Sequence, residues 1–292
     1  MLACGPFTAN NELSYEALKD LMGIVNRDKP QALLLCGPFV NQNHEDIASG
    51  DLRYRDPDTG ALKFFSYDEL FTQIMNYIES QLSGSRHTKV IIVPSTSEVS
   101  HMYPMPQPPL EGKQFQFTKM KLGNHMPVLT SNPSVIQIND VSVGIVNTDV
   151  IKDMCINTCV KNPAAEPGAQ PQNRPKIDLV LQSILQQRSF YPLYPAGAGA
   201  PIEWEQYKAL MFEQTPDILI TPSDLMLFAK NIEGCICINP GSMYKGASAG
   251  TYATLTIDPL VRTTMLSDSV GELESLLSNR ASDRIRVDIH NI

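Results

Sequence analysis

The sequence predicts an α/β fold in which two packed mixed β-sheets are flanked by helices, and three observations support this prediction. Short, continuous apolar runs recur along the chain, as expected for strands that are buried on both faces. Amphipathic segments with helical spacing separate the first of these runs. The second half of the chain adds a hairpin pattern, which indicates antiparallel pairing. We therefore expect an α/β/β/α sandwich.

A repeated tetrapeptide marks the ends of the first two predicted strands. Cys4-Gly5-Pro6-Phe7 and Cys36-Gly37-Pro38-Phe39 lie 32 residues apart, and the segment between them has apolar residues on one helical face. Ser14 is the candidate N-cap of this helix. A strand, a helix and a strand over this distance form a βαβ unit. The two copies should therefore end neighbouring parallel strands at the same edge of one sheet.

The same unit continues into a third strand. Ser66-Tyr67-Asp68-Glu69 has the capping-box pattern that opens a helix, and Val90-Ile91-Ile92-Val93 is the next buried strand. Residues 50–60 have the composition of an exposed loop. Residues 102–110 contain four prolines, which predicts irregular and partly extended chain.

Antiparallel pairing is predicted to begin after residue 134. Residues 135–146 form a hairpin pattern around the two-residue turn Asn139-Asp140. A helical stripe follows at residues 177–185, and two strands are expected at residues 217–220 and 235–238, with a short helix around residues 225–228 between them. Residues 251–257 and 285–289 alternate in the manner of a half-solvated sheet.

The domain organisation is predicted to be simple. Residues 161–175 are rich in Ala, Pro, Gly and Gln, which is typical of a mobile surface insertion. The other apolar segments follow one another to the C-terminus without a linker, so we expect one domain over residues 1–292.

Composition excludes several classes of function. The 292 residues include 23 basic and 31 acidic side chains, for a formal charge of −8, whereas a broad DNA-binding face normally needs an excess of Lys and Arg. No apolar run approaches the roughly 20 residues that cross a bilayer, so no membrane partner is expected. The six cysteines lack the CxxC spacing of a zinc site. Cys36, Cys235 and Cys237 lie in apolar runs, as expected for buried reduced thiols.

The predicted strand ends show a first resemblance. Asn239-Pro240-Gly241-Ser242 follows a strand, and the order and spacing of the strand ends before it resemble the calcineurin-like metallophosphoesterases. In that family the strand ends carry Asp-x-His, Gly-Asp-x-x-Asp, Gly-Asn-His-Asp and Gly-His-x-His motifs, which bind two metal ions. Here these motifs are absent, so we expect no catalytic, metal-binding or cofactor-binding residue. The residues expected to line a vestigial site are Pro38, Asn41, Ser95, Pro222, Asp224 and Asn239.

An active site with an unconventional ligand set is the alternative. Gly123-Asn124-His125 spells most of one phosphoesterase motif, although Met126 stands where an acid is expected. A divalent-metal phosphohydrolase of this kind would have to bring together the side chains of Asn41, His44, Glu98, His125 and Asp224.

A second resemblance is narrower. The string Gln187-Arg188-Ser189-Phe190-Tyr191-Pro192-Leu193-Tyr194-Pro195, together with Gly-Pro-Phe at two strand ends, resembles the family of B subunits of eukaryotic DNA polymerase alpha. The likeness runs from the first residues to about residue 257. The sequence does not distinguish core residues from interface residues among Phe190, Tyr191 and Tyr194.

This resemblance implies a non-catalytic accessory subunit in the nucleus that supports the initiation of DNA replication. Its partners would be the C-terminal domain of the catalytic subunit of DNA polymerase alpha and, through the complex, primase, with DNA contacted only weakly or indirectly. In that family an oligonucleotide/oligosaccharide-binding-type domain and an N-terminal domain precede this region, and neither is visible here. The nearest alternatives are the small subunit of another replicative polymerase and a binding module with unrelated partners.

Overall fold

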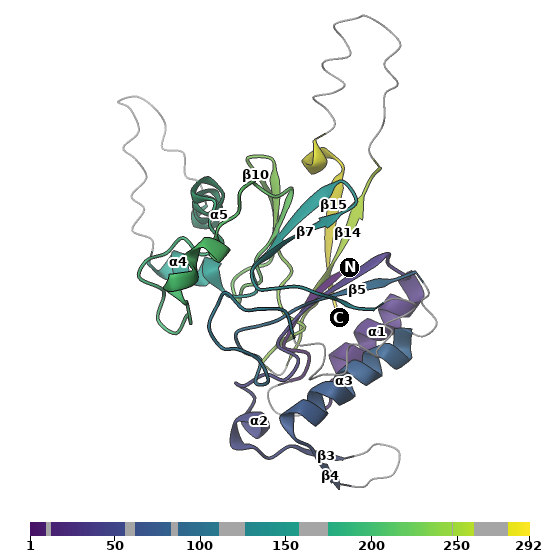
Figure 1. Cartoon of the computed structure of the whole chain (residues 1–292). Helices are drawn as coiled ribbons and strands as arrows, with labels where there is room; N and C mark the ends of the chain where they lie inside the picture. The colour runs from purple at the N-terminus through teal and green to yellow at the C-terminus, as the bar shows by residue number, and fades with distance from the viewer. Residues whose placement is uncertain are drawn as a thin grey trace, which may run out of the picture.

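The computed structural model describes residues 1–9, 13–55, 62–82, 87–110, 126–157, 175–246, 248–259 and 280–292. They form four layers, in which two β-sheets pack face to face and a pair of helices covers each outer face (Figure 1). The predicted α/β/β/α sandwich is therefore confirmed. Within these residues, no helix is both long and apolar enough to span a membrane.

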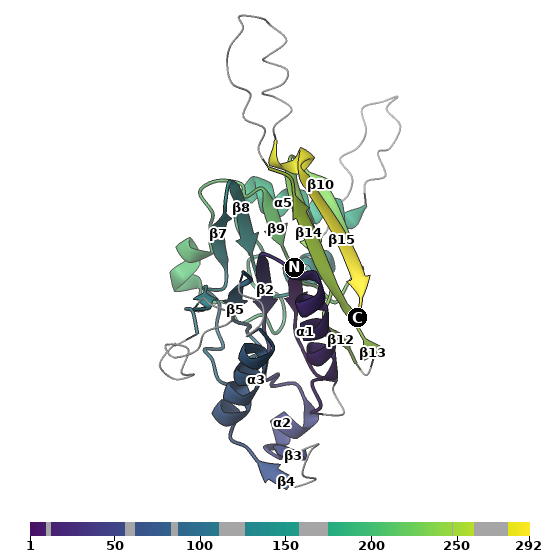
Figure 2. The ribbon, with the colours of Figure 1, turned by 90° about the vertical axis from the view of Figure 1, so that its right-hand side faces the viewer.

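The first sheet has six strands in the order β15-β14-β1-β2-β5-β6. Strands β1, β2, β5 and β6 are parallel, and β14 and β15 extend the sheet beyond β1 by antiparallel pairing (Figure 2). The alternating C-terminal segments thus complete the first sheet, although they are far from it in sequence. The bounds are β1 Leu2–Cys4, β2 Ala32–Cys36, β5 Lys89–Val93, β6 Val128–Leu129, β14 Thr251–Ile257 and β15 Ile285–Asn291.

The second sheet has five strands in the order β10-β11-β9-β8-β7. Its three central strands are parallel, and the two outer strands are joined to it by antiparallel hairpins. The bounds are β7 Ser134–Ile138, β8 Val141–Ile145, β9 Ile218–Ile220, β10 Phe228–Ile232 and β11 Cys235–Asn239. Parallel strands therefore end at a common edge in both sheets, which gives each sheet a set of loops on the same side.

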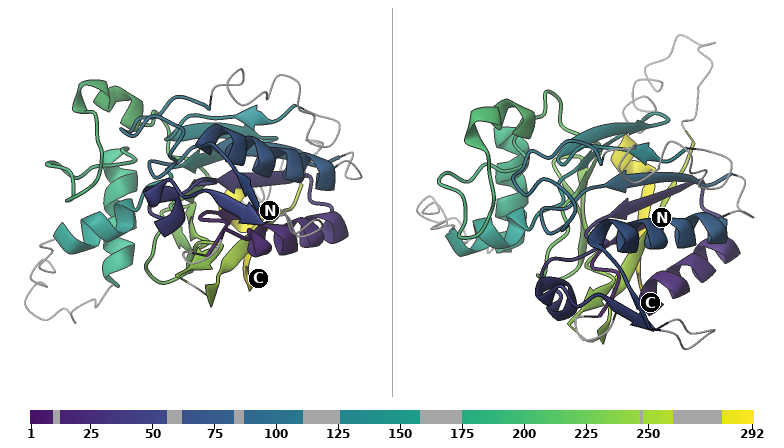
Figure 3. Two further views of the ribbon diagram at one scale, coloured as in Figure 1. Left: turned by 90° about the horizontal axis from the view of Figure 1, so that it is seen from below. Right: turned by 60° about the horizontal axis from the view of Figure 1, so that its bottom comes forward.

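Two helix pairs close the sandwich on opposite sides (Figure 3). Helices α1 (Glu16–Asp28) and α3 (Tyr67–Leu82) bury their apolar faces against the first sheet, while α4 (Val150–Asn157) and α5 (Lys176–Gln187) cover the second. A third apolar cluster fills the space between the two sheets. The smaller elements are α2 Glu45–Ser49, η1 Trp204–Leu210, η2 Ala281–Asp283 and the hairpins β3 Arg53–Arg55/β4 Leu62–Phe64 and β12 Tyr244–Lys245/β13 Ser248–Ala249.

Several local predictions are confirmed. The two copies of the repeated tetrapeptide end neighbouring parallel strands, with Cys4 in register with Cys36. The capping box forms in both directions, because the Glu69 carboxylate accepts from the Ser66 backbone N–H at 2.8 Å and the Ser66 hydroxyl accepts from the Glu69 N–H at 3.3 Å. The turn of the predicted hairpin has Asn139 in the left-handed region, at φ 54°.

Two local predictions are wrong. Ser14 does not cap the first helix: Tyr15 takes the cap position in a left-handed conformation, and its hydroxyl donates to the Phe39 carbonyl at 3.0 Å, so a tertiary contact fixes this helix start. Residues 225–227 are not helical, and Phe228 begins strand β10 instead. The predicted insertion at residues 161–175 lies outside the described residues except for Pro175, which precedes α5.

Candidate functional site

The carboxyl ends of the parallel strands surround a cleft of about 700 Å³. In an α/β sheet this edge is where ligands bind, because the loops that follow parallel strands converge there. Five of the six residues predicted to line a vestigial site do line this cleft. They are Pro38, Asn41, Ser95, Pro222 and Asp224.

The sixth predicted residue, Asn239, supports the cleft from behind. Its side chain is fully buried, and its Oδ1 accepts from the backbone N–H groups of Ser223 and Gly241, both at 3.0 Å. Its Nδ2 donates to the carbonyls of Ser223 and Met226, both at 3.1 Å. One amide thus holds the loop after β9 against the turn after β11, and the residues 225–227 predicted to be helical lie in this loop instead.

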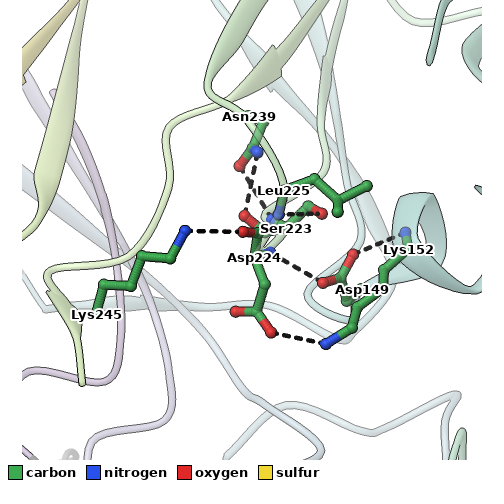
Figure 4. A network of polar contacts seen from close by, with 7 residues as sticks. All are labelled: Asp149, Lys152, Ser223, Asp224, Leu225, Asn239 and Lys245. Carbon is green, nitrogen blue, oxygen red and sulfur yellow. Dashed lines mark hydrogen bonds and ion pairs between the residues drawn. The ribbon is translucent and has the colours of Figure 1, made fainter. Parts of the chain in front are cut away.

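Asp224 is the centre of an exposed charged network (Figure 4). Its carboxylate pairs with Lys152 Nζ at 3.0 Å, and its carbonyl accepts from Lys245 Nζ at 3.1 Å. Its backbone N–H donates to Asp149 Oδ2 at 2.9 Å. The carboxylate of Asp224, which the sequence predicted at this edge, is therefore neutralised by a lysine from α4.

Asp149 stands directly before α4 and caps it. Its Oδ1 accepts from the Lys152 backbone N–H at 3.0 Å, while its other oxygen holds the loop after β9 through Asp224. Burial raises the pKa of this carboxyl above its ordinary value, although hydrogen bonds from Ser223 and two backbone N–H groups act in the opposite direction. The carboxyl is used to join α4 to the second sheet.

Glu98 is buried beneath the first sheet's half of the edge. Its two oxygens accept from the backbone N–H groups of Phe39 at 2.6 Å and Val40 at 2.8 Å. Burial raises the pKa of Glu98 to about 7, and the two backbone hydrogen bonds oppose that shift without cancelling it. The carboxyl fixes the loop that follows β2 and does not line the cleft.

The structure does not bring together the described side chains that the alternative phosphohydrolase would need as metal ligands. Asn41 and Asp224 line the cleft, whereas Glu98 and His44 lie outside its lining. His44 is buried at the start of α2, where its Nδ1 accepts from the Asp46 N–H at 3.2 Å. His125 lies outside the described residues. Within the described part of the chain, no three His, Cys, Asp or Glu side chains gather as a metal ion would need.

Three buried amides that the sequence did not single out tie the two sheets together at this edge. Asn147 follows β8, and its Nδ2 donates to the carbonyls of Gly37 at 3.0 Å and Pro94 at 2.9 Å, both on the first sheet's side. The Asn147 N–H donates to Asn132 Oδ1 at 2.8 Å, and Asn132 Nδ2 donates to Gln107 Oε1 at 2.9 Å. No pattern in the sequence identifies such a network, because its members are 15 to 110 residues from their partners.

The three aromatic residues of the string after α5 lie partly in the core and partly on the surface. Phe190 is buried against Phe212, with ring centroids 5.0 Å apart. The buried Tyr191 donates its hydroxyl to Asp153 Oδ2 at 2.7 Å. Tyr194 is 77% exposed and touches the ring of Trp204 edge-on. Two of the three aromatics are therefore core residues, and the third is on the surface.

The fold and the cleft together define a class of protein, an α/β/β/α sandwich with a strand-end edge built largely from proline, amide and hydroxyl side chains. The carboxylates at this edge bind neighbouring backbone N–H groups or a lysine. The chain belongs to the family of B subunits of DNA polymerases alpha and epsilon, whose sequence profile matches residues 1–230.

Curated relatives support this assignment. The chain is 33% identical over 258 residues to the DNA polymerase alpha B subunit of Mus musculus, and the match covers 87% of the chain and 39% of the relative. It is 31% identical over 268 residues to that of Schizosaccharomyces pombe (89% and 42%), and 28% identical over 327 residues to that of Saccharomyces cerevisiae (99% and 44%). The chain thus spans about two fifths of the length of these relatives, and the resemblance to polymerase alpha B subunits is confirmed.

Among solved structures, an archaeal phosphodiesterase aligns with 82% of this chain and 82% of its own, at a TM-score of 0.36 and 9% identity. These values are too low to support an inference about activity.

Proposed function

We propose that this chain is a non-catalytic accessory subunit of the DNA polymerase alpha–primase complex. In this role it binds the C-terminal domain of the catalytic subunit, is linked through it to primase, and supports the initiation of DNA replication in the nucleus. The observation that carries the proposal is the family assignment over residues 1–230, and the chemistry of the cleft supports it.

The cleft supports a structural rather than a catalytic role because polar side chains in it and directly behind it bind the protein's own groups. Asn41 Oδ1 accepts from the Asn43 N–H at 3.1 Å, and Asn239 and Glu98 hold backbone groups from behind. A dinuclear phosphoesterase site needs carboxylates and imidazoles that converge on hard cations. We infer that Pro38, Asn41, Ser95, Pro222, Asp224 and Asn239 are the remains of such a site.

The proposal is tested by mixing the chain with the zinc-bearing C-terminal domain of the polymerase alpha catalytic subunit, followed by size-exclusion chromatography and calorimetry. A stable complex is expected, with a buried area well above about 1,000 Å². The corresponding domain of polymerase epsilon is the matched competitor, because the family includes both kinds of subunit. A folded chain that fails to associate, even in a fusion with the domains that precede this region in the family it resembles, contradicts the proposal.

Two further measurements address catalysis and DNA. No hydrolysis of phosphomonoesters or phosphodiesters is expected with added manganese, magnesium or zinc. Metal-dependent turnover that disappears in Asp224→Ala would show an enzyme. With a charge of −8, the chain should bind DNA no more tightly than a Kd of about 10⁻⁵ M at physiological salt. Submicromolar binding that survives raised salt would instead show a direct nucleic-acid site.

A further inference from the structure

Strand β15 ends the first sheet on one side, and in the described part of the chain no other strand pairs with its open side (Figure 2). It has seven residues, whereas the other outer strands of the two sheets, β6, β7 and β10, have two, five and five. Its pairing with β14 is continuous, without a bulge, and it contains no proline. Short strands, bulges and prolines are devices that keep the open side of a sheet from pairing with another chain. Because β15 lacks all three, it is well suited to accept another strand.

The hydrogen bonds between β14 and β15 determine which backbone groups of β15 are left for a partner. Two bonds flank this ladder: the Asp258 N–H donates to the Arg284 carbonyl at 2.9 Å, and the Ile292 N–H donates to the Gly250 carbonyl at 3.1 Å. Hydrogen-bonded pairs alternate with non-bonded pairs in an antiparallel ladder, so the even-numbered residues of β15 bond to β14. The N–H and carbonyl groups of its odd-numbered residues therefore point to the open side.

The two central even-numbered residues of β15 carry charges of opposite sign. Arg286 and Asp288 project from the same face of the strand, because side chains two residues apart share a face. They pair with each other at 2.9 Å, and their side chains are 77% and 36% exposed. The other face carries Ile285, Val287 and Ile289, which are partly buried against the apolar cluster between the two sheets. A strand that pairs with β15 thus meets one charged face and one apolar face.

This pattern is complementary to itself about Val287. When two copies of β15 pair antiparallel with a two-fold axis at this residue, Arg286 of each copy lies opposite Asp288 of the other, and Ile285 lies opposite Ile289. The charged pairs then occupy the non-hydrogen-bonded positions, where facing side chains are closest. A register shifted by two residues would instead set Arg286 against Arg286 or Asp288 against Asp288, and like charges directly opposite each other are unfavourable. The charges therefore select one register.

From these observations we propose that β15 is the interface of a two-fold symmetric dimer of this chain, in which the first sheets of two copies join across their β15 strands into one continuous sheet. The contact is isologous, since each copy gives and receives the same backbone hydrogen bonds and ion pairs. This inference goes beyond the proposed function, because the partner is a second copy of the chain and not the catalytic subunit.

The test uses charge reversal in the full chain, with Arg286→Asp and Asp288→Arg as single variants and the exchange of both charges as the double variant. Sedimentation velocity over a range of protein concentrations gives the Kd of the dimer, because an interface of one strand pair is small and should exchange with monomer. Arg53→Asp is the matched control, since Arg53 is 57% exposed, also pairs with an aspartate two residues away, and lies on β3, away from β15 (Figure 2). Circular dichroism melts confirm that every variant folds.

The unchanged chain should form a dimer, and each single variant should weaken it at least about tenfold, because two attractive pairs become two repulsive ones. The double variant should restore the dimer, since the exchanged charges again face their opposites. A mixture of the two single variants should form a heterodimer, in which both aspartates of one chain face both arginines of the other. Arg53→Asp should leave the Kd unchanged.

Three results would overturn the proposal. The unchanged chain could remain a monomer at every concentration. The dimer could form but resist the single variants, which would show that another surface joins the copies. The single variants could fail to associate when mixed, which would exclude the antiparallel register about Val287.

A strand of the catalytic subunit is the other occupant that the experiment distinguishes. If the chain is a monomer that binds the C-terminal domain of the catalytic subunit, and Arg286→Asp abolishes that binding, the open side of β15 accepts the partner and the dimer is wrong. A chain that dimerises through β15 but does not bind this domain would contradict the proposed function alone.

Discussion

The two halves of the strand-end edge hold their loops with opposite chemistry. On the first sheet's side, Glu98 is 3% exposed and its two oxygens bind two backbone N–H groups. On the second sheet's side, the paired carboxylate of Asp224 is 71% exposed and its lysine, Lys152, is 44% exposed. The same chemical group, a carboxylate beside a strand end, is a buried support in one half and a solvated surface group in the other.

This difference predicts how much each carboxylate contributes to the free energy of unfolding. A buried carboxyl that satisfies two backbone donors is expensive to remove, since both donors then lose their partners inside the protein. An exposed ion pair adds little, because water and salt screen it and two side chains lose freedom to form it. The buried support of Glu98 should therefore contribute much more to stability than the exposed pair of Asp224 and Lys152.

The largest expected effect is the loss of Glu98. Glu98→Ala should lower the free energy of unfolding by about 4 kcal/mol, because the N–H groups of Phe39 and Val40 are left buried without acceptors. Urea unfolding at pH 6 measures this change, and Glu213→Ala, at an exposed position, is the control. A loss below about 1 kcal/mol would show that water reaches the two N–H donors. The buried Glu98 would then contribute no more to stability than the exposed Asp224.

The second effect is the pH dependence of stability. The pKa of Glu98 is raised from 4.5 to about 7 by burial, so between these values the folded chain holds a proton that the unfolded chain has lost. Stability from this group is fully present below pH 4.5 and is lost as the pH rises through 7, by about 3 kcal/mol in all.

Unfolding of the unchanged chain and of Glu98→Gln, measured from pH 4.5 to pH 8, isolates this effect. The difference between the two chains should change over the window, because the glutamine cannot titrate while Asp149, whose pKa is also raised, remains in both. Parallel curves for the two chains would mean that Glu98 titrates normally.

A smaller loss is expected at the amide behind the cleft. Asn239→Ala removes the acceptor of two buried N–H groups, those of Ser223 and Gly241, and should lower the free energy of unfolding by about 2 kcal/mol. Asn231→Ala provides a control in which the amide accepts from the N–H of Gly234 at an exposed turn. Equal losses for the two variants would contradict the importance of burial.

The smallest effect is expected at the exposed ion pair. Asp224→Ala should change the free energy of unfolding by less than about 1 kcal/mol, because both partners are largely solvated. The same variant removes the carboxylate that pairs with Lys152, while Lys245 keeps the backbone carbonyl as its acceptor, so weak DNA binding should increase, as measured by fluorescence anisotropy at low salt. A large loss of stability would mean that this exposed ion pair supports the fold as the buried Glu98 does.

Sequence alone determined the elements whose cause is local. The repeated Cys-Gly-Pro-Phe predicted two parallel strands that end together, and the capping box and the Asn139-Asp140 turn formed as expected. Hydrophobic periodicity and turn chemistry act within a few residues, so they can be read directly from the chain. The family resemblance also lay in contiguous strings, and the comparison with relatives confirmed it.

Only the tertiary structure decided how the polar residues are used. Tyr15 takes the cap position of α1 in place of Ser14, and its hydroxyl reaches the Phe39 carbonyl. The Met226 carbonyl, in a segment predicted to be helical, instead accepts from Asn239, 13 residues away. Asn41, Glu98 and Asp224 looked equivalent as candidate ligands in the sequence. The fold buried Glu98 against backbone amides and left Asp224 in solvent beside a lysine, because burial and hydrogen-bond partners are set by segments that are distant along the chain.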